Sequence, residues 1–265
     1  MRLVLLILLV LTLAAPVLAQ PSRYGAPDNL ADHIDLRLPE NAEGPFPVVL
    51  FFPGCGGVQS LQSDYGDVAL AEGWAVATID SFQARGIGRT GAIMTVCTAV
   101  RLRGQQRAAD LFAAMDILRA DERLDLDKAA AVGWSHGSWV VLDALALAQR
   151  NRQAEQAISG LSTAYLLYPY CGTLSIADRH PIGDQVDITM VIVGRDRVVG
   201  EQGCRNLAEA RSAEGSQIDI IYEPTLTHAF DAPDQRRDPR MRYDREGTAR
   251  SHAAFAAVLR GASEP

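Results

Sequence analysis

Ser135 lies in the pentapeptide Gly133-Trp-Ser-His-Gly137, whose residue types suit nucleophilic catalysis. Small apolar residues at 129–132 predict a buried strand before it, and the apolar run at 138–142 predicts a helix after it. A serine on a sharp strand-to-helix turn needs neighbours without side chains, because strand and helix must approach while the hydroxyl stands clear. The first N–H groups of such a helix point at charge that develops beside the serine. The alternative interpretation is a glycine-rich turn with an unused serine.

A base and an acid are needed before a serine hydroxyl becomes a strong nucleophile. Among the five histidines only His228 follows a late predicted strand, and Asp196 follows an earlier one in Gly194-Arg-Asp-Arg197. Ser135, Asp196 and His228 occur in a chain order known for catalytic triads. The competing interpretations are a surface ion pair between Asp196 and a flanking arginine, and a solvated loop histidine.

The elements that must position these residues alternate between apolar strands and amphipathic helices. Expected strands cover residues 33–38, 48–52, 74–79, 129–133, 164–168, 188–193 and 218–222. Expected helices cover 62–72, 101–119, the segment after the strand-to-helix turn at 133–137 (the elbow), and 248–259. This alternation predicts an α/β fold with a doubly wound, mostly parallel sheet, in a single domain over residues 20–265. Ligands of such sheets bind at the carboxyl ends of the strands, where all three candidate residues fall.

A second glycine motif, Gly86-Ile-Gly-Arg-Thr-Gly91, matches a dinucleotide-binding fingerprint. We reject a nucleotide site, because that fingerprint needs a strand that leads directly into the glycines and a helix that opens within them. Here a loop precedes the glycines and the next helix is expected later. A loop over the pocket is the preferred interpretation, and no cofactor is expected.

The N-terminus has the three parts of a secretory signal peptide: Arg2, an apolar run, and small residues up to Ala19. The alternative is a membrane anchor, but the run is shorter than the roughly 20 residues that span a bilayer. We expect residues 1–19 to be removed from a secreted or periplasmic protein without stable membrane insertion. The formal net charge of −7 argues against a nucleic-acid partner, which would favour a basic surface.

Four cysteines, an even number in an exported chain, suggest two disulfides. Three pairings are possible in principle. We expect Cys55 with Cys97 and Cys171 with Cys204, because each pair joins loops at neighbouring strand ends. The alternatives are free buried thiols and a catalytic Cys55 thiol. No C-x-x-C or H-E-x-x-H pattern occurs, so a metal site has little support.

Several of these motifs together resemble the dienelactone hydrolase family of α/β-hydrolases, particularly its exported members, over about residues 32–259. The motifs are Pro53-Gly-Cys-Gly-Gly57, Asp80-Ser-Phe with Arg85-Gly86, the Ser135 pentapeptide, Gly194 with Asp196, His228-Ala-Phe-Asp231, and Tyr243-Asp244. The resemblance implies an α/β-hydrolase fold with Ser135 as nucleophile, Asp196 as acid and His228 as base. It also implies an oxyanion hole from the N–H groups of Cys55 and His136. Dienelactone hydrolase proper is similar but has a cysteine as nucleophile.

The sequence therefore favours a serine hydrolase that cleaves small carboxylic esters or lactones through an acyl-enzyme. Arg85 is a candidate for pairing with a substrate carboxylate, the alternative being a structural arginine. Two rival functions use the same scaffold. One is a binding protein without turnover, which the complete set of Ser, Asp and His disfavours. The other is an acyltransferase or peptidase. The identity of the substrate and the oligomeric state cannot be derived from the sequence.

Overall fold

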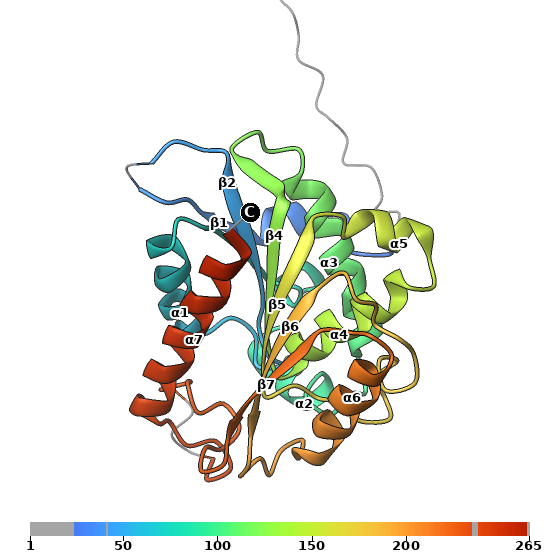
Figure 1. Ribbon diagram of the computed structural model, residues 1–265, viewed down its shortest axis with the longest axis vertical. Helices are drawn as coiled ribbons and strands as arrows, with labels where there is room; N and C mark the ends of the chain where they lie inside the picture. The colour runs from blue at the N-terminus through green and yellow to red at the C-terminus, as the bar shows by residue number, and fades with distance from the viewer. Residues whose placement is uncertain (1–23, 41, 235–237, 264–265) are drawn as a thin grey trace, which may run out of the picture.

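The computed structural model describes residues 24–40, 42–234 and 238–263, so the expected signal peptide lies outside the described residues. Seven strands form one twisted sheet in the order β1-β3-β2-β4-β5-β6-β7 (Figure 1). All neighbouring strands pair in parallel except β1 with β3, which pair antiparallel. The strands are β1 (Ile34–Arg37), β2 (Phe46–Phe52), β3 (Ala75–Ile79), β4 (Leu124–Trp134), β5 (Leu161–Leu167), β6 (Asp187–Val193) and β7 (Ile218–Glu223).

Helices cover both faces of the sheet, as Figure 1 shows, with α1 and α7 on one face and α3, α4 and α5 on the other. The helices are α1 (Ser60–Ala71), α2 (Arg89–Thr95), α3 (Gly104–Leu118), α4 (His136–Ala148), α5 (Arg152–Ala157), α6 (Gln202–Ala213) and α7 (Arg245–Ser263), with 3₁₀ turns η1 (Leu30–His33) and η2 (Gln83–Arg85). This cover explains the apolar sequence of the central strands, since neither face of the sheet is left to water.

The core has two main layers, one on each side of the sheet. Val48, Leu50 and Phe52 of β2 pack with α3 and α4, whereas Val49 and Phe51 pack with α1 and α7. This alternation is the two-residue period of a strand, with apolar side chains on both faces. The sheet therefore gives a rigid platform whose carboxyl-end loops carry the candidate functional residues.

Most predicted elements are present with boundaries shifted by a few residues, and two predictions need correction. The expected linker before the elbow strand is partly strand, because β4 begins at Leu124. The expected loop at 86–91 contains the start of helix α2 at Arg89, so a helix does open within the Gly86–Gly91 motif. The strand β3 nevertheless ends at Ile79, well before the glycines, so the motif still lacks the strand-to-glycine junction of a dinucleotide site.

Helices α5 and α6 were not expected from the sequence. Helix α6 buries a narrow stripe that includes Cys204, Leu207 and Ala208, and most of its other residues are polar. The segment therefore contains few apolar residues to mark it as a buried element, although those it has share one face. Among the described residues, no helix is both long and apolar enough to cross a bilayer.

Candidate active site

Ser135 occupies a strained turn between β4 and α4. Its backbone φ is 53°, a left-handed value that is rare for residues other than glycine. The turn is held from both sides: the Ser135 N–H donates to Leu167 O at 2.9 Å, and Ser135 O accepts from Trp139 N at 3.1 Å. The Ser138 hydroxyl adds hydrogen bonds to Gly133 O at 2.6 Å and Leu167 O at 3.0 Å. Strain of this kind persists only where the surroundings fix it, and it is common at functional sites.

The two glycines of the elbow are required by close backbone contacts. A Cβ at Gly137 would lie 1.7 Å from Phe52 O, and a Cβ at Gly133 would lie 2.4 Å from Ser138 N. Either contact is shorter than any real non-bonded contact. The first turn of α4 therefore packs directly on the carboxyl end of β2, and only glycine permits this approach.

The structure brings Ser135, His228 and Asp196 into one hydrogen-bonded line. The Ser135 Oγ lies 2.9 Å from His228 Nε2, and His228 Nδ1 lies 2.8 Å from Asp196 Oδ2. The side chains of His228 and Asp196 are 4% and 3% exposed, while Ser135 is partly accessible. This is the geometry in which an imidazole accepts the serine proton while a carboxylate fixes its Nδ1–H tautomer.

Asp196 is held as an ionised acceptor. Its Oδ1 accepts hydrogen bonds from the N–H groups of Val198 at 2.9 Å and Val199 at 3.0 Å. Burial alone would raise the pKa of Asp196, but the hydrogen bond and charge of His228, together with those two N–H groups, hold this pKa below its usual value. The partners of Asp196 are thus the imidazole and its own loop, so the interpretation as a surface pair with Arg195 or Arg197 is wrong.

The loops that carry the acid and the base are tied together by their backbones. The Gly194 N–H donates to Glu223 O, and the Arg195 N–H donates to Leu226 O, both at 3.0 Å. The His228 ring also packs on the Tyr168 ring, with 4.7 Å between the centroids. These contacts come from elements far apart in the sequence, which fixes the imidazole from several sides.

His136, the residue next to Ser135, has a different environment from His228. Its Nδ1 lies 3.3 Å from Nη1 of the buried Arg107. A guanidinium only donates, so Nδ1 accepts and the imidazole is neutral. Burial and the positive charge of Arg107 lower the pKa of His136 to about 3. This side chain is therefore unsuited to act as a base near neutral pH.

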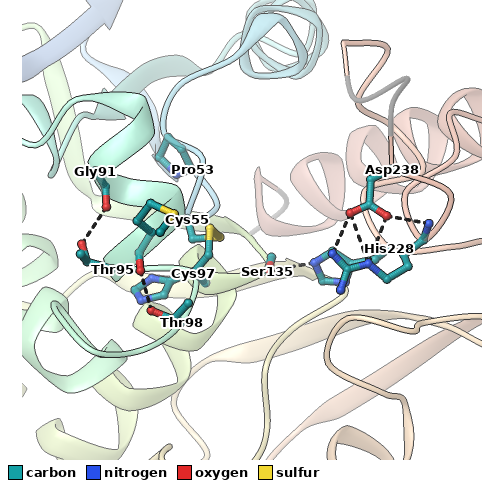
Figure 2. Close-up of a disulfide and its surroundings, with 12 residues drawn as sticks. Pro53, Cys55, Gly91, Thr95, Cys97, Thr98, Ser135, His228 and Asp238 are labelled. Atoms are coloured by element: carbon teal, nitrogen blue, oxygen red, sulfur yellow. Dashed lines mark hydrogen bonds and ion pairs between the residues drawn. A yellow bond between two sulfur atoms is a disulfide. The ribbon is translucent and has the colours of Figure 1, made fainter.

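The loop after β2 faces the elbow. A Cβ on Gly54 would lie 3.3 Å from Trp134 O and 3.8 Å from Cβ of Ser135. A disulfide joins the next residue, Cys55, to Cys97 just after α2, and Figure 2 shows this bridge on the side of Ser135 away from His228. The second disulfide joins Cys171 to Cys204. Both pairs are those named from the sequence, and Cys55 is not a free thiol.

Arg85 does not have its guanidinium free for a substrate. Its two terminal nitrogens form a bidentate ion pair with the buried Asp110, both at 2.8 Å, and Nη1 also donates to Ser81 O at 2.8 Å. The geometry favours the structural interpretation of this arginine over the substrate-binding one.

Asp231 is a buried carboxylate close to the triad whose role was not predicted from the sequence. Oδ1 of Asp231 accepts from Tyr168 Oη at 2.7 Å, and Oδ2 accepts from Tyr65 Oη at 3.1 Å and Trp134 Nε1 at 3.2 Å. Asp231 lies three residues after His228, so its position in the motif was the available signal. Burial raises the pKa of this carboxyl, while its three donors oppose that shift.

Comparisons with known proteins identify the family and the fold of the chain. The model of the dienelactone hydrolase family matches residues 35–263. No curated protein matches the chain. The chain is similar in structure to a dienelactone hydrolase-like promiscuous phosphotriesterase from metagenomic libraries, with a TM-score of 0.68, 17% identity, and coverage of 86% of this chain and 91% of the other.

Two further solved structures give similar values. A candidate dienelactone hydrolase from Klebsiella pneumoniae has a TM-score of 0.66 at 18% identity, covering 86% of this chain and 92% of the other. Thermogutta terrifontis esterase 2, phosphorylated by paraoxon, has a TM-score of 0.66 at 15% identity, covering 87% and 88%. At these identities the likeness shows a shared α/β-hydrolase fold.

Proposed function

Because the chain belongs to the dienelactone hydrolase family, we propose that it is a secreted serine hydrolase of small carboxylic esters or lactones. The observation that carries the proposal is the continuous hydrogen-bonded line from Ser135 through His228 to Asp196. Solved structures of an esterase and of a promiscuous phosphotriesterase share the fold, which supports hydrolysis of an ester bond.

In the first half of the reaction, Ser135 Oγ attacks the carbonyl carbon of the ester while His228 Nε2 takes the serine proton. The carbonyl oxygen becomes an oxyanion, which accepts hydrogen bonds from the backbone N–H groups of Cys55 and His136. Asp196 keeps the proton of His228 on Nδ1 and stabilises the imidazolium. Collapse of the tetrahedral species breaks the bond to the alcohol oxygen, which receives the proton from His228.

In the second half, water attacks the acyl-enzyme in the same way. His228 takes a proton from the water, the oxyanion forms again in the same hole, and collapse returns the proton to Ser135. A lactone follows the same steps, except that its alcohol stays attached to the acyl group. The scheme needs no cofactor.

Turnover of a panel of short p-nitrophenyl esters and lactones tests the proposal. Ser135→Ala should lose at least about 10³-fold in kcat, since the nucleophile is removed. Ser212→Ala, on the exposed face of α6, is the matched control and should keep the wild-type rate. Undiminished turnover by a folded Ser135→Ala protein would refute the proposed nucleophile.

A fluorophosphonate probe separates this function from its rivals. We expect it to label the wild type on Ser135 and to leave Ser135→Ala unlabelled. A folded wild type that takes up no probe would favour a binding protein. Labelling without turnover of any ester or lactone would favour acyl transfer or peptide chemistry.

Export is the remaining part of the proposal. Two disulfides are typical of oxidising compartments, which supports a secreted or periplasmic location. Intact-mass measurement on the exported protein should find a chain that begins at Gln20. A mature chain that retains residues 1–19 would contradict the cleavage after Ala19.

A further inference from the structure

Arg107 of α3 is a fully buried cation whose side chain ends beside the elbow. Among the described residues, no carboxylate lies within ion-pair distance of its guanidinium. The nearby Asp110 is engaged by both terminal nitrogens of Arg85. A buried charge without a contacting counter-ion is costly, so such a residue is retained where its position or its field has a use.

The guanidinium connects three segments, two of which carry the proposed oxyanion donors. Nη1 donates to Pro53 O at 2.7 Å, at the start of the loop that carries Cys55. The same nitrogen lies 3.3 Å from Nδ1 of His136. Nε donates to the Ser81 hydroxyl at 2.8 Å, in the loop after β3.

Both segments that carry the proposed oxyanion donors are therefore held by this one side chain. Cys55 lies two residues after the carbonyl that Arg107 holds, and His136 supplies its N–H from the residue whose ring Arg107 contacts. Figure 2 shows Pro53 and Cys55 on the side of Ser135 opposite His228, where the negative charge of the tetrahedral species would form. The disulfide holds the same loop from the other side, through Cys97.

The charge of Arg107 persists at neutral pH. Burial, together with the nearby charge of Arg85, lowers the pKa of Arg107 to about 10, while Asp110 and Asp80 act in the opposite direction from beyond contact distance. The cation also lies over the Phe82 ring, 4.7 Å from its centroid. The positive charge is thus fixed in place and shielded from water, and in such a setting it acts strongly on charge that develops nearby.

We propose that Arg107 is the positioning residue of the oxyanion hole: it fixes the two backbone segments whose N–H groups bind the oxyanion and supplies positive charge behind them. The inference rests on the proposed function. It assigns to Arg107 an effect on the transition state rather than on substrate binding, because the side chain is fully buried and therefore out of reach of a substrate.

The test compares Arg107→Met with Arg107→Lys and with the control Arg211→Met. Arg211 is a buried arginine of α6 that pairs with Glu214, so its loss reports the general effect of removing a buried cation. For each variant we would measure kcat and KM on the best ester. We would also measure the inhibition constant of a trifluoromethyl ketone, whose adduct with a serine carries an oxyanion, and the melting temperature.

We expect Arg107→Met to lower kcat by about 100-fold, the size of effect seen when one oxyanion donor is lost, with little change in KM. The affinity of the ketone should fall by a similar factor. Arg107→Lys keeps the charge and one donor, so it should recover about tenfold of each loss. Arg211→Met should change melting temperature without changing the ratio of ketone affinity to KM.

Three outcomes would overturn the inference. One is wild-type kcat and ketone affinity in a folded Arg107→Met protein. Another is the same ratio change in Arg211→Met. If Arg107→Met does not fold, Arg107→Lys decides, and unchanged kcat and ketone affinity in that variant would overturn the inference. An inactive wild type that no fluorophosphonate labels would overturn the proposed function and this inference together, whereas the three results above leave the proposed function standing.

Discussion

His136 and His228 show how environment assigns different chemistry to the same residue type beside one serine. The Nδ1–H of His228 donates to Asp196, and its Nε2 faces the Ser135 hydroxyl, so this ring is placed to accept the serine proton. His136 faces the cation of Arg107, which keeps its ring neutral. The sequence alone does not distinguish the roles of the two histidines, because Arg107 contacts His136 only when α3 and α4 are packed together.

The low pKa of His136, about 3 against 6.5, makes a prediction about acid stability. The unfolded chain binds a proton below pH 6.5 and the folded protein does not. The stability that neutral His136 contributes is therefore present above pH 6.5 and is lost as pH falls toward 3, by at most about 5 kcal/mol. Urea unfolding would be measured for wild type and His136→Asn at pH 7, 5 and 4. The difference between their free energies of unfolding should become smaller as the pH falls. A gap that stays constant would contradict the prediction, and other titrating groups cancel because both proteins carry them.

The carboxylate of Asp231 supports a second prediction. Asp231→Leu would leave Tyr65, Tyr168 and the indole N–H of Trp134 without their acceptor in a buried site. We expect the free energy of unfolding to fall by about 3 kcal/mol or more. We also expect slower turnover, because Trp134 precedes Ser135 and the Tyr168 ring packs on His228.

Urea unfolding and ester kinetics check this prediction. Asp234→Leu is the matched control, since Asp234 is exposed in the same loop and accepts a hydrogen bond from Ser60. Its loss should cost less than about 1 kcal/mol. Equal effects of the two substitutions would argue against a role for burial at Asp231.

At the scale of elements, the parts of the fold that the sequence predicted are those with strong local signals. The buried strands β2, β3 and β6 are apolar runs bounded by turn residues, and the glycines of the elbow mark the strand-to-helix junction. Helix α2 was not predicted because it buries only Ala92, which packs with the following Val96 in a small cluster around Phe82 and not in the main core. The boundaries of such short elements depend on tertiary contacts that have no local sequence signature.

The close contact between the start of α4 and β2 predicts that adding a single methyl group at Gly137 will strongly lower stability and turnover. Gly137→Ala would place a Cβ 1.7 Å from Phe52 O, so the start of α4 must move away from the sheet. We expect a loss of about 3 kcal/mol in the free energy of unfolding, together with a lower kcat because the N–H groups at the start of α4 shift. In the control Gly261→Ala, the added Cβ meets no atom within 4 Å in α7, and the change should stabilise the protein by up to about 1 kcal/mol. Thermal unfolding and ester kinetics on both variants would check this, and similar shifts in the two would contradict it.

Across the whole molecule, the parallel sheet brings the candidate residues to one edge although they lie far apart in the chain. Chain order and position at strand ends can be read from a sequence, so Ser135, Asp196 and His228 could be named in advance. Arg107 could not, because its partner Pro53 is 54 residues away and comes from another layer. Its one local signal was a charge one turn before the buried Leu111, on the face of α3 that packs on the core.

Three of the four disulfide cysteines lie in loops at this same edge, and Cys204 lies in the first turn of α6. The two bridges predict separable effects on stability and rate. Their loops span 42 and 33 residues, so on chain-entropy grounds each bridge stabilises the folded protein by about 4 kcal/mol.

The double variant Cys55→Ala with Cys97→Ala should also lower kcat severalfold, because the backbone N–H of residue 55 is a proposed oxyanion donor and its loop is no longer held by the disulfide. Cys171→Ala with Cys204→Ala should lower stability by a similar amount with a smaller effect on kcat, since Asp196 keeps its hydrogen bonds to Val198, Val199 and His228. Urea unfolding and ester kinetics on the two double variants measure both quantities, and a larger loss of kcat in the second would show that the acid loop depends more on its bridge than the oxyanion loop does.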